Sequence, residues 1–181
     1  GMLTTRHKEW DGKFRLWRQL SMSVTDTVRH ASNSVIFETY PEIGYNYRMT
    51  DVQAAIGREQ LQRLPELVSR RRELAARYGD LLKDIPGLRL PVEPDWARSN
   101  WQSYCVRPPK GVGQKRVMQA MLDGGVATRR GIMCAHREPA YGKELWRPAG
   151  SLVESERAQD ECILLPLYHQ LTTVEQQLIV S

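Results

Sequence analysis

A stretch with strong helix signals between Thr50 and Pro86 constrains the fold of this chain more than any other feature. Thr50, followed three residues later by Gln53, forms a capping-box pattern that predicts the start of a helix. We expect this helix to run to about Leu64. Pro65 suits the first turn of a second helix, where a missing N–H has no consequence. Pro86 and the glycine after it end that second helix.

The second helix has one apolar face, which indicates the side that turns toward a core. Its apolar positions are Leu67, Leu74, Tyr78 and Leu81. An arginine run at residues 70–72, followed by Glu73, lies mostly on the other face. We interpret this run as a solvated helix face in preference to a polyanion site.

The remaining elements predict helices packed on a small, mostly antiparallel sheet, an α/β (α+β) fold. The expected strands are residues 101–107, 126–129 and 162–165, and the expected later helices are 114–122, 151–160 and 172–180. Before Thr50 we expect a short β-prone segment at residues 2–5, a helix over 10–22 and a long loop over 23–43. The strand, helix and strand between 101 and 129 form an α/β unit.

Composition excludes several classes of protein. The chain has 181 residues, of which 41% are hydrophobic, and this excludes wholesale disorder. No apolar run approaches the roughly 20 residues that span a bilayer. Three cysteines form no CxxC pair, which fits free thiols and a cytoplasmic location. The net charge of +5 is spread along the chain, so nucleic-acid binding is a minor hypothesis that rests on charge alone.

Two segments are candidates for chemistry. The GYNYRM segment (residues 44–49) places two aromatic rings, an amide and a guanidinium just before a helix N-terminus, where backbone N–H groups favour anions. It could cradle a phosphate or carboxylate, or its tyrosines could simply pack the helix start while Arg48 pairs with Asp51. The HREPAY loop (residues 136–141) follows a predicted strand, where functional residues tend to lie, although an ordinary polar loop is the plainer interpretation. Cys134 and His136 have no further ligand nearby, so we predict no metal site.

At these residues the sequence resembles the DegT/DnrJ-type aminotransferases. Residues 44–51, GYNYRMTD, followed by QAAIG at 53–57, resemble the hallmark segment of that family. Residues 1–5 resemble the strand that closes its large domain, and residues 100–104 resemble a strand of its small domain. Residues 129–141 resemble its substrate-side loop, and LLPL at 164–167 resembles its closing strand. The resemblance covers nearly the whole chain.

The resemblance implies the C-terminal part of a fold-type I enzyme that uses pyridoxal phosphate (PLP) to aminate keto groups on nucleotide sugars. Residues 1–45 would be a remnant of the large cofactor-binding domain, with a strand, a helix and a long loop. Residues 46–181 would be a helical linker and the small C-terminal domain. The enzyme class would place the chain in the biosynthesis of cell-surface polysaccharides.

The resemblance also implies roles for five residues. Asn46 and Arg48 would bind the cofactor, with Asn46 reaching across a dimer to the phosphate held by the neighbouring subunit. Tyr47, His136 and Tyr141 would face the nucleotide-sugar substrate. No catalytic residue and no metal ligand carries over to this chain.

The lysine to which PLP is attached in this family lies upstream of the strand that residues 1–5 resemble. The six lysines here sit in polar, surface-like contexts, so we expect the chain alone to bind no PLP and to be inactive. We expect a homodimer, or pairing with a missing N-terminal half or a full-length relative, since Leu3, Phe14 and Trp17 would be exposed. The alternative is a stand-alone dimerisation or interaction module without catalysis.

Overall fold

The computed structural model describes residues 2–142 and 147–181. Internal contacts divide the chain into two compact units, Gly1–Gln62 and Arg63–Ser181. The division falls inside one long helix and reflects packing within this chain alone. The expected boundary between residues 45 and 46 concerns the domains of a longer relative, so it stays a prediction.

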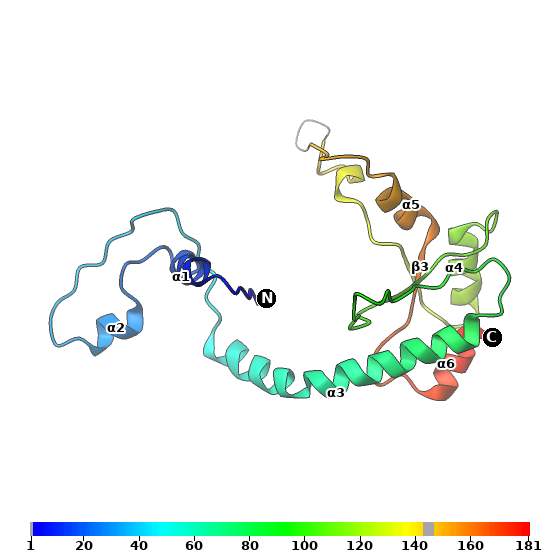
Figure 1. Ribbon diagram of the computed structural model, residues 1–181, viewed down its shortest axis with the longest axis horizontal. Helices are drawn as coiled ribbons and strands as arrows, with labels where there is room; N and C mark the ends of the chain where they lie inside the picture. The colour runs from blue at the N-terminus through cyan, green and yellow to red at the C-terminus, as the bar shows by residue number, and fades with distance from the viewer. Residues whose placement is uncertain (1, 143–146) are drawn as a thin grey trace. The chain divides into compact units, whose positions relative to one another are not determined.

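Six α-helices and three strands make up the described part of the chain (Figure 1). The helices are α1 Lys8–Trp17, α2 Asp26–Ala31, α3 Asp51–Leu82, α4 Gln114–Asp123, α5 Val153–Glu161 and α6 Thr173–Val180. The strands are β1 Tyr104–Val106, β2 Arg129–Arg130 and β3 Ile163–Leu165, and Ala135–Arg137 forms a 3₁₀ turn. Each of the three strands predicted after residue 100 is formed, although β2 holds only the last residue of its predicted range and the one after it.

The first unit differs from its prediction in three places. The helix expected over residues 10–22 is α1, which runs from Lys8 to Trp17, because Leu20 and Ser21 turn the chain with positive φ values. Residues 2–5 form no strand, because a strand needs a neighbour to share its hydrogen bonds and none in the described residues pairs with them. The predicted loop contains α2, whose start is capped by the Thr25 hydroxyl accepting from the Val28 N–H at 3.3 Å. A helix of six residues is too short to give a periodic pattern.

The capping box predicted at Thr50 is confirmed. The Gln53 N–H donates to Thr50 Oγ1 at 3.3 Å, and the Thr50 N–H donates to Gln53 Oε1 at 3.0 Å. The predicted break at Pro65 is wrong, because α3 is one helix with Pro65 inside it. Proline removes a single N–H from the helix interior, and packing of the residues beyond it holds the helix together.

The sheet has the order β1-β3-β2, with β3 antiparallel to both neighbours, so the predicted antiparallel sheet is confirmed. Tyr104 lies opposite Leu165, and Ile163 lies opposite both Val106 and Arg130. Since β1 and β2 both oppose β3, they run parallel to each other. The β1-α4-β2 unit is therefore split by a strand that arrives later in the chain.

The core lies where the C-terminal half of α3 meets this sheet. Its fully buried members include Leu74, Tyr78, Tyr104 and Ile163. The Tyr78 hydroxyl donates to the carbonyl of Pro166 at 2.8 Å, and its ring centroid lies 4.9 Å from that of Tyr104. Leu82, one position beyond the predicted Leu81, completes the buried face, because residues 74, 78 and 82 are four apart on the helix.

The predicted solvated face of the arginine run is wrong. Arg70 donates to the carbonyl of Leu171 at 3.0 Å, and Arg72 donates to that of Ser99 at 2.6 Å. Arg71 donates to the carbonyls of Trp101 and Gln102 at 3.1 and 2.8 Å. Long side chains reach around the helix with their stems packed and their guanidinium groups turned to loop carbonyls. The run thus fixes two loops to α3.

Removing the Arg71 guanidinium should loosen the loop before β1. Trp101 has φ +50°, a left-handed conformation that is unfavourable for a bulky side chain and must be held by its surroundings. We expect Arg71→Ala to lower the free energy of unfolding by about 1–2 kcal/mol, because two charge-assisted hydrogen bonds are lost. Urea unfolding measures the change. Arg63→Ala, an exposed position on the same helix, is the control and should change stability by less than about 0.5 kcal/mol.

The thiol of Cys105 predicts a loss of stability at alkaline pH. Burial and the adjacent Cys162 thiol raise the pKa of Cys105 to about 11. An unfolded cysteine has a pKa near ~8.5, so the folded state retains the proton more tightly. The protonated thiol therefore contributes fully to folding stability below the pKa of the unfolded cysteine, and this stabilisation is lost as the pH rises toward 11. Urea midpoints at pH ~8 and ~9.5 should differ less in Cys105→Ala than in the parent, and an unchanged difference would refute the assignment.

Candidate functional site

The GYNYRM segment is held in place by backbone hydrogen bonds to the end of α1. The Tyr45 N–H donates to the carbonyl of Trp17 at 2.6 Å, and the Tyr47 N–H donates to that of Arg18 at 2.9 Å. The Leu20 N–H donates back to the Tyr45 carbonyl at 2.9 Å. An isolated antiparallel bridge between Gln19 and Asn46 thus fixes the position of the segment ahead of α3.

Gly44 is required at the start of this segment by a close backbone approach. A Cβ at this position would overlap the backbone of Leu20 and Ser21. These two residues have φ values of 61° and 60°, a left-handed conformation that L-residues seldom adopt. A strained turn packed against a glycine is typical of backbone held for a purpose other than stability.

The side chains of the segment face solvent and contact one another. Arg48 Nε donates to Asn46 Oδ1 at 2.9 Å, so the two predicted cofactor ligands lie together. The rings of Tyr45 and Tyr47 stack at 5.2 Å with an interplanar angle of 4°. Asn46, Tyr47 and Arg48 are all exposed. The arrangement offers a guanidinium and an amide at a fixed place, with the N-terminus of α3 following directly.

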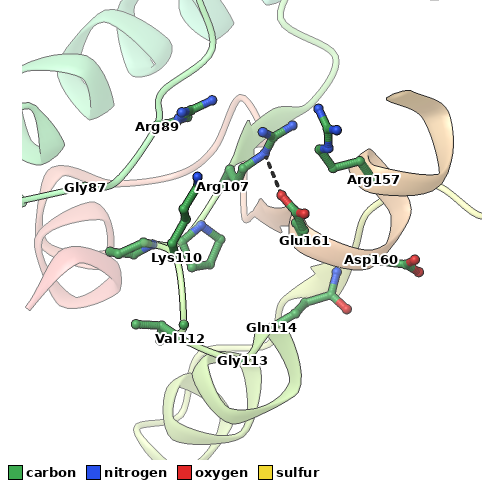
Figure 2. A pocket seen from close by; sticks show the side chains of 13 residues that line it. Gly87, Arg89, Arg107, Lys110, Val112, Gly113, Gln114, Arg157, Asp160 and Glu161 are labelled. Carbon is green, nitrogen blue, oxygen red and sulfur yellow. Dashed lines mark ion pairs between the residues drawn. The ribbon is translucent and has the colours of Figure 1, made fainter. Parts of the chain in front are cut away.

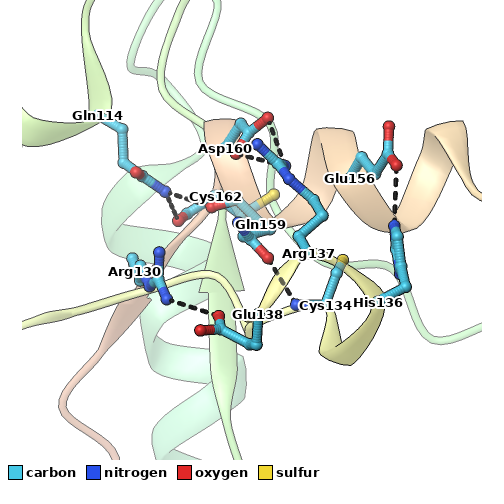
Figure 3. A network of polar contacts seen from close by, with 10 residues as sticks. All are labelled: Gln114, Arg130, Cys134, His136, Arg137, Glu138, Glu156, Gln159, Asp160 and Cys162. Carbon is cyan, nitrogen blue, oxygen red and sulfur yellow. Dashed lines mark hydrogen bonds and ion pairs between the residues drawn. The ribbon is translucent and has the colours of Figure 1, made fainter. Parts of the chain in front are cut away.

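The HREPAY loop lies in the second unit, against α5 (Figure 3). His136 Nε2 lies 2.8 Å from Glu156 Oε1, and only 12% of the His136 side chain is exposed. Arg137 pairs with Asp160 at 2.8 Å, and this hydrogen bond raises the pKa of the guanidinium. Tyr141 is 52% exposed. The structure therefore holds His136 firmly and leaves Tyr141 open to solvent.

Sequence reasoning missed the partners of this loop. Glu156 and Asp160 are four residues apart on α5. Glu156 contacts His136, and Asp160 accepts from Arg137. Between them on the helix, Gln159 Oε1 accepts from the Cys134 N–H at 2.5 Å. Three polar residues on one face of α5, at i, i+3 and i+4, were the available signal. It is visible only once the loop is known to lie beside that helix.

The described residues contain neither a metal-binding cluster nor a membrane-spanning helix. No group of three or more His, Cys, Asp or Glu side chains among them is placed to hold a metal ion. None of the described helices combines the length and the apolar character needed to cross a bilayer.

The split, three-stranded antiparallel sheet with its long helix defines a class: it is the fold of part of a fold-type I aminotransferase. The chain belongs to the DegT/DnrJ/EryC1/StrS aminotransferase family, whose sequence profile matches residues 1–181. The resemblance drawn from the motifs is confirmed at that level.

Individual relatives agree with this assignment. The chain is 30% identical to the spore coat polysaccharide biosynthesis protein SpsC of Bacillus subtilis, over 95% of this chain and 45% of the relative. It is 35% identical to a dTDP-4-dehydro-2,3,6-trideoxy-D-glucose 4-aminotransferase of Saccharopolyspora spinosa, over 74% of this chain and 34% of that enzyme. The aminotransferase TlmJ of Streptoalloteichus hindustanus matches with a TM-score of 0.76 and 32% identity, over 97% of this chain and 44% of TlmJ.

The chain thus spans less than half the length of each of these relatives. A PLP form of a sugar aminotransferase is also among the matching structures.

Proposed function

We propose that this chain is the C-terminal part of a PLP-dependent sugar aminotransferase, which transfers an amino group to a keto-sugar nucleotide. The observation that carries the proposal is the GYNYRM segment, which presents Asn46 and Arg48 together on backbone pinned to α1. Family membership supports the reaction class. The three cysteines of the chain are unpaired thiols, and this supports a cytoplasmic location.

The donors around Asn46 fit the phosphate of PLP. A guanidinium gives charge-assisted hydrogen bonds to phosphate, and the amide of Asn46 adds a neutral donor. The N-terminal turn of α3 adds the positive end of a helix dipole. When bound, PLP supplies the electron sink for amino transfer. In this proposal Asn46 and Arg48 hold the cofactor phosphate, with Asn46 contributed across a homodimer.

The lysine that holds the cofactor is proposed to come from outside these 181 residues. Lys8, Lys13, Lys83, Lys110 and Lys115 are all exposed, and Lys143 lies outside the described residues. A lysine that reacts with a carbonyl is commonly activated by desolvation in an apolar pocket. None of the five exposed ammonium groups is desolvated in that way. The chain alone is therefore proposed to bind no PLP and to be inactive.

Contacts with the sugar substrate are assigned to Tyr47 in the first unit and, separately, to His136 and Tyr141 in the second unit. Tyr47 and Tyr141 are exposed aromatic side chains with a hydroxyl at the tip, suited to stacking and hydrogen bonding with a sugar. Glu156 fixes the imidazole of His136, so that its other ring nitrogen is oriented.

A homodimer is part of the same proposal. The sequence predicted that Leu3, Phe14 and Trp17 would be exposed. Leu3 is 67% exposed, whereas Phe14 and Trp17 are half-buried with their rings 6.2 Å apart. Other apolar side chains of the first unit are well exposed: Phe37, Ile43, Val52 and Ile56. Their exposure supports burial against a second subunit or a missing domain.

Borohydride reduction in the presence of PLP tests the lysine assignment. After reduction, the intact mass of the 181-residue chain and the position of any label are determined. We expect no label, or weak label spread over several lysines. Stoichiometric labelling of a single lysine would show a self-contained cofactor site and would overturn this part of the proposal.

The role of Asn46 is tested in a full-length relative, at the position that matches it. Asn46→Ala should weaken retention of PLP during gel filtration, followed by the absorbance of the bound cofactor. Asn33→Ala, an exposed asparagine upstream of the GYNYRM segment, is the matched control and should leave retention unchanged. Equal retention in both variants would contradict the assignment.

A further inference from the structure

A basic pocket in the second unit has no part in the function proposed above. Its volume is about 680 Å³, and it is bounded by the chain around Arg89, by the 107–114 connection between β1 and α4, and by the end of α5. Figure 2 shows the side chains of Arg89, Arg107 and Lys110 converging at one side, with Arg157 of α5 beside them. Its lining does not include His136 or Tyr141.

The pocket carries more positive charge than its own acids neutralise. Arg107 Nε lies 3.4 Å from Glu161, and Asp160 is already paired with Arg137. Arg157 pairs with Glu154, which does not line the pocket. Among the described residues, neither Arg89 nor Lys110 makes an ion pair. Within the described ranges, Arg89 and Lys110 thus line the pocket without a carboxylate partner.

A backbone bridge places two of the arginines opposite each other at the pocket. Arg89 and Arg107 form an antiparallel bridge, in which each N–H donates to the carbonyl of the other at 2.9 Å. Residues directly opposite in such a pair have close side chains, and like charges there repel. The bridge therefore places two cationic side chains at the pocket, of which, in the described part of the chain, only Arg107 has a carboxylate partner, Glu161.

The N-terminus of α4 opens at the same pocket. Gly113, its N-cap, has no side chain to accept from the first-turn N–H groups. The next residue, Gln114, donates from its Nε2 to the carbonyls of Gln159 and Cys162 at 2.8 and 2.6 Å. These bonds tie the start of α4 to α5 and β3. No described residue accepts a hydrogen bond from the first-turn N–H groups of α4, so they can bind an anion.

We propose that this pocket binds a phosphate-bearing small molecule. Arg89 and Arg107 provide planar forks that match phosphate oxygens, Lys110 adds a point charge, and the α4 N–H groups complete the donors. The volume falls within the range of about 300–1,000 Å³ typical of ligand pockets. The inference does not depend on the aminotransferase assignment, because every residue it uses lies in the second unit and outside the GYNYRM segment and HREPAY loop.

Titration of inorganic diphosphate into the 181-residue chain tests the proposal. Amide resonances are followed by NMR at physiological ionic strength, so that exposed surface charges are screened. We expect saturable shifts at Arg89, Gln114 and Lys115. The double variant Arg89→Gln/Lys110→Gln should weaken binding by about tenfold or more, equivalent to the loss of one strong contact.

A second double variant, Arg63→Gln/Lys83→Gln, removes the same kinds of charge from exposed positions on the same unit, away from the pocket. It should bind diphosphate as the parent does. Absence of saturable shifts in the parent would overturn the proposal. So would equal weakening in the two variants, because it would show attraction to net charge in place of a site.

Discussion

Tyr78→Ala should lower the free energy of unfolding of the second unit by about 3–5 kcal/mol, as expected for deleting a large buried aromatic side chain. Tyr78 is fully buried and joins α3 to the sheet through the ring of Tyr104 and the carbonyl of Pro166. Removing it leaves a cavity between helix and sheet, and the half-buried carbonyl of Pro166 loses its donor. Urea unfolding, followed by hydrogen exchange of the Ile163 and Leu165 amides in β3, measures the loss.

Tyr78→Phe separates the hydroxyl from the ring. It keeps the packing against Tyr104 and removes only the 2.8 Å hydrogen bond to Pro166, so we expect a loss of about 1–2 kcal/mol. If Tyr78→Ala were no more destabilising than Tyr78→Phe, the ring would contribute little and the assignment of the core to this helix–sheet contact would be wrong.

The parts of the fold that could be predicted are those set by local pattern. The capping box at Thr50 consists of two residues that are three positions apart, and β1 and β3 each consist of a short apolar run. Whether the helix continues through Pro65 depends on how strongly the later half of α3 packs on a core formed by distant residues. The local sequence could not predict it. The arginine run at 70–72 failed for the same reason, because its acceptors are carbonyls in loops that follow much later in the chain.

The candidate site divides in the same way. The GYNYRM segment could be found because its residues are contiguous, and the contact between Arg48 and Asn46 is local. The strained turn at Leu20 and Ser21, which pins the segment, has no sequence signature because neither residue is glycine. The basic pocket is lined by Arg89, Lys110 and Arg157 from separate segments of the chain, so no sequence motif could have predicted it.

Gly131→Ala should destabilise the second unit by about 2–3 kcal/mol and release the HREPAY loop from α5. Gly131 is buried directly after β2, and its N–H donates to the carbonyl of Cys162 at 2.7 Å. A Cβ there would overlap the carbonyl oxygen of Ala158 in α5. The obstacle is backbone and cannot rotate away, so either the helix or the chain after β2 must shift. The contact between His136 and Glu156 should then be lost, which the NMR signals of the His136 ring would report.

Gly79→Ala is the matched control, because the same methyl group added inside α3 meets nothing within 4 Å. It should stabilise the protein by up to about 1 kcal/mol, since alanine has the higher helix propensity. The same substitution is therefore expected to lower stability at Gly131 and to raise it at Gly79, and urea midpoints distinguish the two outcomes directly. A Gly131→Ala protein as stable as the parent, with the His136 signals unmoved, would show that α5 does not pack on this glycine and that the loop is held in some other way.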